Sequence, residues 1–179
     1  MNYIRDYDIF ILLETWMPKV GELLSKFKGY QIYFLPANKI NKRGRYSGGI
    51  VIGVKENIAK GVTKVEENST FLVVKLDKNY FQTQKDIVIV GVYFPPQNST
   101  YFTKFPNKHL FDELQEVIIK HAAQGDKDTL LIGDMNARVG KMQDYDYTCT
   151  DMPTIALPYQ SKFNIPRCSQ DETTNNFGK

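Results

Sequence analysis

Three apolar stretches of the sequence end in polar side chains whose types could act together on a charged substrate. The stretch FILLE ends in Glu14, IVGVY ends in Tyr93, and LLIGDMN carries Asp134 and Asn136. A sheet holds the ends of buried strands rigidly while the side chains there reach solvent, so sites in α/β folds often form at such ends. The sequence therefore predicts that these four side chains meet at one edge of the fold.

The four side chains supply what phosphoester hydrolysis needs. A carboxylate such as Glu14 is a hard oxygen ligand for Mg²⁺ (or Mn²⁺), which takes one or two protein carboxylates and keeps several waters. Asp134 could orient or deprotonate a water, while Asn136 and Tyr93 could donate hydrogen bonds to a phosphate oxygen. We therefore expect Glu14 to be the metal ligand and Asp134, Asn136 and Tyr93 to be catalytic. Gly133 would give the backbone room beside Asp134.

Each of these residues also has a purely structural explanation. Glu14 could stabilise the N-terminus of a helix through its macrodipole. Asp134 and Asn136 could form an Asx turn after a strand. Tyr93 could be a core aromatic residue whose hydroxyl reaches the surface. Both explanations stay open for each residue taken singly, and the combination favours a site.

A basic stretch, residues 37–47 (ANKINKRGRYS), is expected to form an exposed loop. Lys42, Arg43 and Arg45 are candidates for binding a nucleic-acid backbone, because clustered cations neutralise phosphates. A solvated loop is the simpler explanation for any one of them. Tyr46 and the two glycines after it could bring the backbone close to a ligand or serve a tight turn. The net charge of +3 permits a polyanionic partner without requiring one.

The elements that would position these side chains are short strands and two helices. Helical spacing of apolar residues predicts one helix within residues 17–30, capped by Thr15 and ended by Gly29, and another at 110–125. Short apolar runs predict strands at 8–13, 30–36, 48–55, 71–76, 86–94 and 128–134.

Two segments are expected to lack regular structure. Residues 55–70 are polar and predict a connection, and residues 95–108 contain three prolines. Strands within 48–94 would follow one another without helices between them, which favours an α/β sandwich of mixed sheets over a parallel doubly wound sheet. The apolar run at 130–132 is expected to enter the core.

The composition is that of a globular protein, with 42% hydrophobic and 24% charged residues. The length of 179 residues suits one domain over 1–179. Two cysteines are too few for a disulfide framework. Charges interrupt the N-terminal apolar residues, and IFILL is too short for a membrane span. We expect an intracellular protein, nuclear or cytoplasmic, neither secreted nor bound to a membrane.

The segments LLETW, GVYFPP and LIGDMNARVG resemble the endonuclease/exonuclease/phosphatase superfamily over roughly residues 5–179. This superfamily includes apurinic endonucleases, deoxyribonuclease I type enzymes and inositol polyphosphate 5-phosphatases. GDxN followed by Ala, a basic residue and Val-Gly is most similar to the branch of non-LTR retrotransposon endonucleases and craniofacial-development-protein-like sequences. The resemblance implies a four-layered α/β sandwich, in which two mixed β-sheets are flanked by helices and the site lies at one rim.

The resemblance also implies roles and partners. Glu14 matches the metal-binding glutamate, Tyr93 the active-site tyrosine, Asp134 the aspartate that positions water or the leaving group, and Asn136 the asparagine that contacts phosphate. The implied activity is an Mg-dependent phosphodiesterase that cleaves DNA as a monomer. A phosphomonoesterase acting on inositol phosphates is an alternative.

The sequence departs from the family pattern in three places. The asparagine strand expected ahead of Glu14 is missing, Tyr93 is followed by Phe-Pro-Pro rather than x-Pro-Asn, and no Asp-His pair is present. We therefore expect a partial domain, incomplete at the C-terminus and nearly inactive as this chain. A non-catalytic remnant that binds nucleic acid or a protein is the other alternative.

Overall fold

The computed structural model describes residues 2–39, 44–123, 127–138, 173 and 175. The chain divides into two compact units, Met1–Asn136 and Ala137–Lys179. In the second unit, the backbone N–H of Arg138 donates a hydrogen bond to Oδ1 of Asn175, and the backbone N–H of Asn175 donates one to the Arg138 carbonyl, each at 2.9 Å. The first unit holds the strands and helices. That residues 1–179 form one domain stays a prediction.

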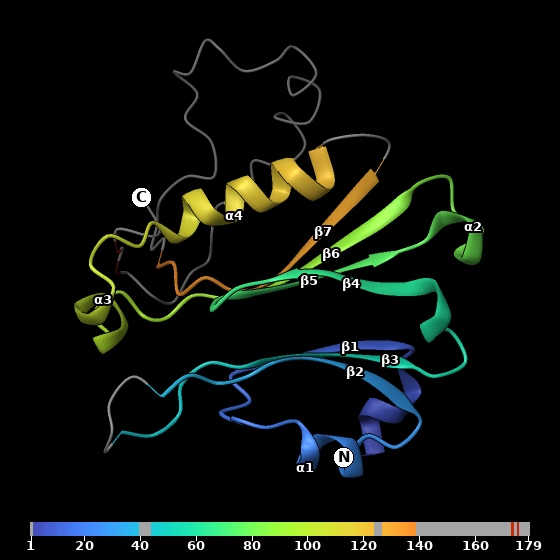
Figure 1. Ribbon diagram of the computed structural model, residues 1–179, viewed down its shortest axis with the longest axis horizontal. Coiled ribbons are helices and arrows are strands. Elements are labelled where there is room, and N and C mark those ends of the chain that lie inside the picture. The colour runs from blue at the N-terminus through green and yellow to red at the C-terminus, as the bar shows by residue number, and fades with distance from the viewer. Residues whose placement is uncertain (1, 40–43, 124–126, 139–172, 174, 176–179) are drawn as a thin grey trace. The chain divides into compact units, whose positions relative to one another are not determined.

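One sheet of the first unit is antiparallel, with strand order β1-β3-β2 (Figure 1). Its strands are β1 (Ile9–Leu13), β2 (Tyr30–Leu35) and β3 (Ile50–Lys55). Helix α1 (Gly21–Lys26) covers one face, where Leu23 and the following Phe27 pack against Phe10 and Tyr30. A 3-10 helix, η1 (Asn2–Asp6), precedes β1.

The other sheet has the order β4-β5-β6-β7 and is mixed, because β6 and β7 pair in parallel. Helix α4 (Leu110–Ile118) and the π-helix η3 (Ile119–Ala123) form the crossover between those two strands. The strands are β4 (Val62–Glu67), β5 (Phe71–Leu76), β6 (Asp86–Tyr93) and β7 (Lys127–Asp134). The shorter elements are η2 (Ala59–Gly61), α2 (Lys78–Phe81) and α3 (Thr100–Lys104).

The two sheets face each other with helices on their outer sides, as Figure 1 shows. The core between them takes apolar side chains from both sheets, including Ile50 and Ile52 from β3 and Leu72 and Val74 from β5. Alternate residues of β5 and β6 pack outward against α4. Burial on both faces explains why these strands are continuous apolar runs. The predicted fold class, an α/β sandwich with two sheets and flanking helices, is confirmed.

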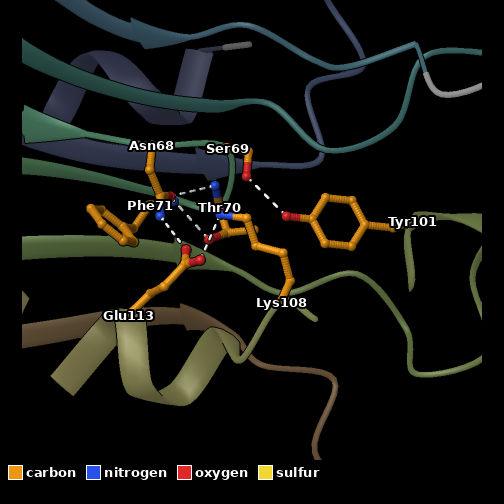
Figure 2. Close-up of polar contacts among 7 residues, drawn as sticks. All are labelled: Asn68, Ser69, Thr70, Phe71, Tyr101, Lys108 and Glu113. Atoms are coloured by element: carbon orange, nitrogen blue, oxygen red, sulfur yellow. Dashed lines mark hydrogen bonds and ion pairs between the residues drawn. The ribbon is translucent and has the colours of Figure 1, made fainter. Parts of the chain in front are cut away.

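The turn between β4 and β5 is built around Asn68, which also joins this sheet to α4 (Figure 2). Its side-chain oxygen accepts hydrogen bonds from the backbone of Thr70 at 2.7 Å and of Phe71 at 3.0 Å. Its amide nitrogen donates to Glu113 of α4 at 2.8 Å. The carbonyl of Thr70, whose side chain is buried, then accepts a hydrogen bond from the Tyr93 backbone at 2.8 Å.

Three expectations about the elements are wrong. Helix α1 begins at Gly21 and has Val20 as its N-cap residue, so Thr15 does not cap it. Residues 55–70 contain β4, which stays polar because it is the edge strand beside β5. Residues 95–108 contain α3, a helix short enough to fit between the prolines.

Strand β7 is more exposed than its apolar sequence predicts. The exposed fractions of Leu130, Leu131 and Ile132 are 47%, 38% and 38%. Within the part of the chain that the structure describes, β7 pairs with β6 alone, so one of its edges has no neighbouring strand. Its expected burial in the core is therefore wrong. No helix in the described ranges combines the length and hydropathy required to cross a membrane.

Candidate active site

The side chains of Glu14 and Tyr93 meet, although they follow strands of different sheets. The Tyr93 hydroxyl donates a hydrogen bond to Glu14 Oε1 at 2.5 Å. Tyr93 is buried at the end of β6, while Glu14 lies exposed just beyond β1. The bond therefore fixes one carboxylate oxygen of Glu14 and leaves the group accessible from solvent. Glu14 precedes no helix directly, so its macrodipole explanation is wrong.

The backbone after β1 is strained at Glu14 and Trp16. Glu14 and Trp16 have φ values of 50° and 53°, in the left-handed region that side chains rarely adopt. Their segment stays attached to the start of β3, because Thr15 and Trp16 donate backbone hydrogen bonds to the carbonyls of Gly49 and Gly48. Strained residues held by surrounding structure are frequent at functional sites.

Gly48 and Gly49 allow this close approach. A β-carbon at Gly48 would lie 3.3 Å from Cδ1 of Tyr93, and one at Gly49 would lie 2.4 Å from Thr15 Oγ1. Both glycines have positive φ, 74° and 93°. The two glycines after Tyr46 therefore bring this backbone close to the Tyr93 ring and to Thr15. That they also bring it close to a ligand stays a prediction.

Ser47 is a functional candidate that sequence reasoning missed. Its hydroxyl donates a hydrogen bond to the Tyr93 oxygen, which lowers the pKa of that phenol. A small cavity beside the ring is also lined by Asn38, Ser69, Pro95 and Tyr101. The signal available was the short Tyr-Ser-Gly-Gly segment before β3, where small residues permit close packing.

The pKa of Tyr93 is raised well above its ordinary value of 10.0. Burial is the main cause, because it disfavours the charged phenolate. The hydrogen bond to Glu14 and the negative charges of Glu14 and Asp134 raise the pKa further. Tyr93 therefore keeps its proton at neutral pH and acts as a hydrogen-bond donor rather than as a base.

Asp134 stands beside Tyr93 on the neighbouring strand. The two residues are partners in the parallel register of β6 and β7, and parallel partners point to the same face of a sheet. The Phe94 backbone donates to the Asp134 carbonyl at 2.8 Å, which fixes the ends of both strands. The Asp134 carboxylate thus lies close enough to Tyr93 to influence its pKa.

Gly133 is required by the packing of β7 on β6. A β-carbon there would lie 2.0 Å from the carbonyl oxygen of Val92, which is impossible without moving the backbone. Gly133 therefore gives β7 room against β6. That it also leaves room for a phosphate beside Asp134 stays a prediction.

Asn136 forms an Asx turn with Asp134. Its backbone N–H donates to Asp134 Oδ1 at 2.8 Å, and its side-chain Nδ2 donates to the Phe94 carbonyl at 2.7 Å. The φ of 49° suits asparagine, which tolerates the left-handed region. The turn explanation is therefore correct for both residues, and it also holds Asn136 beside the end of β6. A phosphate contact by Asn136 stays a prediction.

The nucleic-acid candidates are only partly described. Lys42 and Arg43 lie outside the described residues. Arg45 is exposed, and its guanidinium lies 5.8 Å from the centre of the Trp16 ring. The two histidines are placed elsewhere: His121 pairs through Nε2 with Glu66 on β4, and His109 precedes α4.

The donor set fits a hard divalent cation that keeps most of its waters. Among the described residues, no three His, Cys, Asp or Glu side chains gather into a complete metal site. Glu14 is an exposed carboxylate, and Asp134 is a second carboxylate close to the same tyrosine. One or two carboxylates plus water suit Mg²⁺, whereas structural zinc takes four protein ligands.

Two solved structures are similar to this chain at low sequence identity. The structure of the human Nocturnin catalytic domain with bound sulfate is similar at 18% identity, with a TM-score of 0.46, over 76% of this chain and 54% of that chain. A structure of TDP2 from Caenorhabditis elegans is 14% identical, with a TM-score of 0.40, over 79% of this chain and 42% of that chain.

The chain spans about half the length of these solved structures. No curated protein sequence matches it. The sequence model of the Endonuclease/Exonuclease/phosphatase family matches residues 1–158. The chain therefore belongs to the Endonuclease/Exonuclease/phosphatase family.

Proposed function

We propose that this chain carries the site of a metal-dependent phosphodiesterase that cleaves DNA, of the retrotransposon endonuclease type. The observation that carries the proposal is the hydrogen bond from Tyr93 to Glu14, formed next to Asp134. It joins a hard metal ligand, a neutral donor and a second carboxylate at one rim, which suits a reaction at a charged phosphorus centre.

The proposed roles follow from the hydrogen bonds that the carboxylate oxygens of Glu14 and Asp134 already make within the protein. Tyr93 holds Oε1 of Glu14, so the carboxylate is oriented before it meets the cation. Glu14 would hold Mg²⁺ or Mn²⁺, with Asp134 as a second oxygen donor or water-positioning group. A bound cation supplies Lewis-acid stabilisation of charge on the phosphate oxygens. Oδ1 of Asp134 accepts from the Asn136 backbone, which leaves Oδ2 to orient a water.

Slow turnover by residues 1–179 is part of the proposal. Positioned acid–base groups typically contribute about 10²–10⁴-fold. Of the two histidines, His121 is paired with Glu66 and His109 precedes α4. Binding without turnover is therefore the second candidate function, and the pairing of His121 with Glu66 is the observation that favours it.

The test measures metal binding and cleavage separately. Mn²⁺ binding, followed by water proton relaxation, should weaken in Glu14→Gln and stay unchanged in Glu56→Gln, the exposed control. Slow plasmid nicking should require Mg²⁺ and be lost in Asp134→Ala with the circular dichroism spectrum retained. Unaltered Mn²⁺ binding by Glu14→Gln, or nicking that survives chelation, would refute the proposal. Faster release of phosphate from inositol phosphates than nicking of DNA would replace it by a phosphomonoesterase.

A further inference from the structure

We propose that Trp16 and Arg45 form a binding platform for an unpaired nucleotide, next to Glu14 and Tyr93. The inference rests on the proposed function and names the form of nucleic acid that the site accepts, a single-stranded segment. We call the two side chains, together with the neighbouring pair of Lys39 and Tyr46, the aromatic platform.

The aromatic platform is attached to the same rim as the candidate site. Trp16 lies two residues after Glu14, and its backbone N–H donates to the Gly48 carbonyl at 3.0 Å. Gly48 packs directly against the ring of Tyr93. The backbone of Trp16 is therefore attached to the segment that contacts Tyr93, the partner of Glu14.

Trp16 combines an exposed side chain with a strained backbone conformation. It is the only tryptophan of the chain, and 53% of it is exposed. Its φ of 53° is strained for a bulky side chain. An exposed indole on a strained backbone beside a candidate site is the combination expected of a binding residue, because strain and apolar exposure persist where function requires them.

Each ring of the aromatic platform has a cation beside it. Arg45 lies over Trp16 at 5.8 Å, and Lys39 Nζ lies over Tyr46 at 5.6 Å, each measured to the ring centre. Asn38 and Ser47 exchange backbone hydrogen bonds of 2.9 Å, which hold the two sides of this loop together. Within the described ranges, no carboxylate forms an ion pair with Lys39 or Arg45. Both cations are exposed and available to a phosphate.

This arrangement favours unpaired nucleotides over an intact duplex. Proteins that bind single strands combine cations along the backbone with aromatic rings on which bases stack. In a duplex the base faces are already covered by neighbouring base pairs, so an exposed indole gains little there. A protein that contacted only the phosphate backbone of a nucleic acid would need the cations but not the exposed aromatic ring.

The single tryptophan makes the inference directly measurable. In EDTA, which prevents metal-dependent cleavage, a 12-nucleotide oligothymidylate should quench the fluorescence of Trp16. The same length of blunt duplex should bind at least about tenfold more weakly, because its bases cannot stack on the ring.

Variants distinguish the contribution of base stacking from that of phosphate contacts. Binding is measured by the fluorescence anisotropy of a labelled oligothymidylate. Trp16→Ala should weaken binding by about 5- to 150-fold, the range expected for one stacked base, while Trp16→Phe keeps most of the affinity. Arg45→Ala should reduce the slope of log affinity against log salt by about 0.7, one phosphate contact on a single strand. Tyr7→Ala and Arg5→Ala, exposed residues before β1, should change neither quantity.

The outcomes distinguish this inference from the proposed function. Equal affinity for single strand and duplex, or undiminished binding by Trp16→Ala, would refute the proposal of the aromatic platform. Neither result would bear on the metal site, which Glu14→Gln tests separately. Conversely, if Glu14→Gln leaves Mn²⁺ binding unchanged while oligothymidylate still quenches Trp16, the proposed function fails and the binding surface stands.

Discussion

Tyr93 and Glu14 are 79 positions apart in the sequence, and their side chains share a hydrogen bond of 2.5 Å. One follows β1 of the antiparallel sheet, and the other ends β6 of the mixed sheet. The bond therefore links the two sheets at the rim where Asp134 also ends its strand. The orientation of the candidate metal ligand depends on both sheets.

Tyr93→Phe should weaken metal binding while leaving the fold intact. The substitution keeps the buried ring and removes the hydroxyl, which donates to Glu14 and accepts from Ser47. Partners that orient a metal ligand typically contribute about 10–100-fold to metal affinity or activity. The Mg²⁺ concentration for half-maximal activity, or the Mn²⁺ dissociation constant, should rise by that factor. Tyr33→Phe, which removes a buried hydroxyl bonded to Val62, is the control and should leave metal affinity unchanged.

Gly133→Ala should destabilise the protein, whereas Gly91→Ala should be tolerated. The added methyl group would collide with the Val92 backbone in the first case and make ordinary contacts, the nearest at 3.4 Å, in the second. Overpacking of this kind costs about 1–3 kcal/mol. Calorimetry should therefore show a melting temperature lower by about 2–10 °C for Gly133→Ala alone. Similar melting temperatures for the two variants would contradict the close approach of β7 to β6.

Asn68→Ala should lower the free energy of unfolding by about 1–3 kcal/mol, because it leaves buried donors around Thr70 without an acceptor. Urea denaturation measures the change. Asn57→Ala, an exposed control, should stay within about 0.5 kcal/mol of the wild type. Equal effects of the two substitutions would show that the contacts in Figure 2 do not stabilise the turn.

The contact between Glu66 and η3 should make stability depend on pH in the acid range. Hydrogen bonds from Lys120 and then His121 hold the pKa of Glu66 below its ordinary value of 4.5. A lowered folded-state pKa means that the stabilisation is complete above pH 4.5 and is lost as the pH falls through the lowered value.

Glu66→Gln should therefore cost about 1 kcal/mol or less near neutral pH and nothing at low pH. Denaturation of wild type and variant across the acid range tests this. Glu116→Gln is the matched control, since Glu116 lines the same surface hollow and makes no ion pair with the described residues. A constant difference between wild type and Glu66→Gln at all pH values would be inconsistent with a lowered pKa.

Most strands were predictable from sequence, because two-sided burial demands continuous apolar residues. The strand predicted at 71–76 appears as β5 with the same ends, and the strand predicted at 8–13 appears as β1, which begins one residue later. Strand β4 was not predictable, since VTKVEE has few apolar residues and owes its conformation to pairing with β5. The exposure of β7 was also not predictable. Its apolar sequence indicates burial, but the sequence does not say how many strands pair with β7.

The site was predictable as a set of residues but not as a geometry. That Glu14, Tyr93 and Asp134 end their strands is visible in the sequence, whereas the bond between the first two depends on how the sheets stack. For Asp134 and Asn136 the sequence allowed either a structural turn or a functional site. The hydrogen bond between them shows the turn, and it lies at the same rim as Tyr93, so the two alternatives are compatible. Ser47 and Trp16 were missed because their roles arise from neighbours that come from other segments.

Among the described strands, β6 and β7 are the pair that runs in parallel, and α4 separates them in the chain. A parallel pair cannot be aligned by a tight hairpin, so its register is set only after a long crossover has docked. A slip of one residue would send Asp134 to the opposite face from Tyr93. We therefore expect the candidate site to form only after α4 has docked, and mutations that loosen α4 to disturb the site without changing any group at the rim.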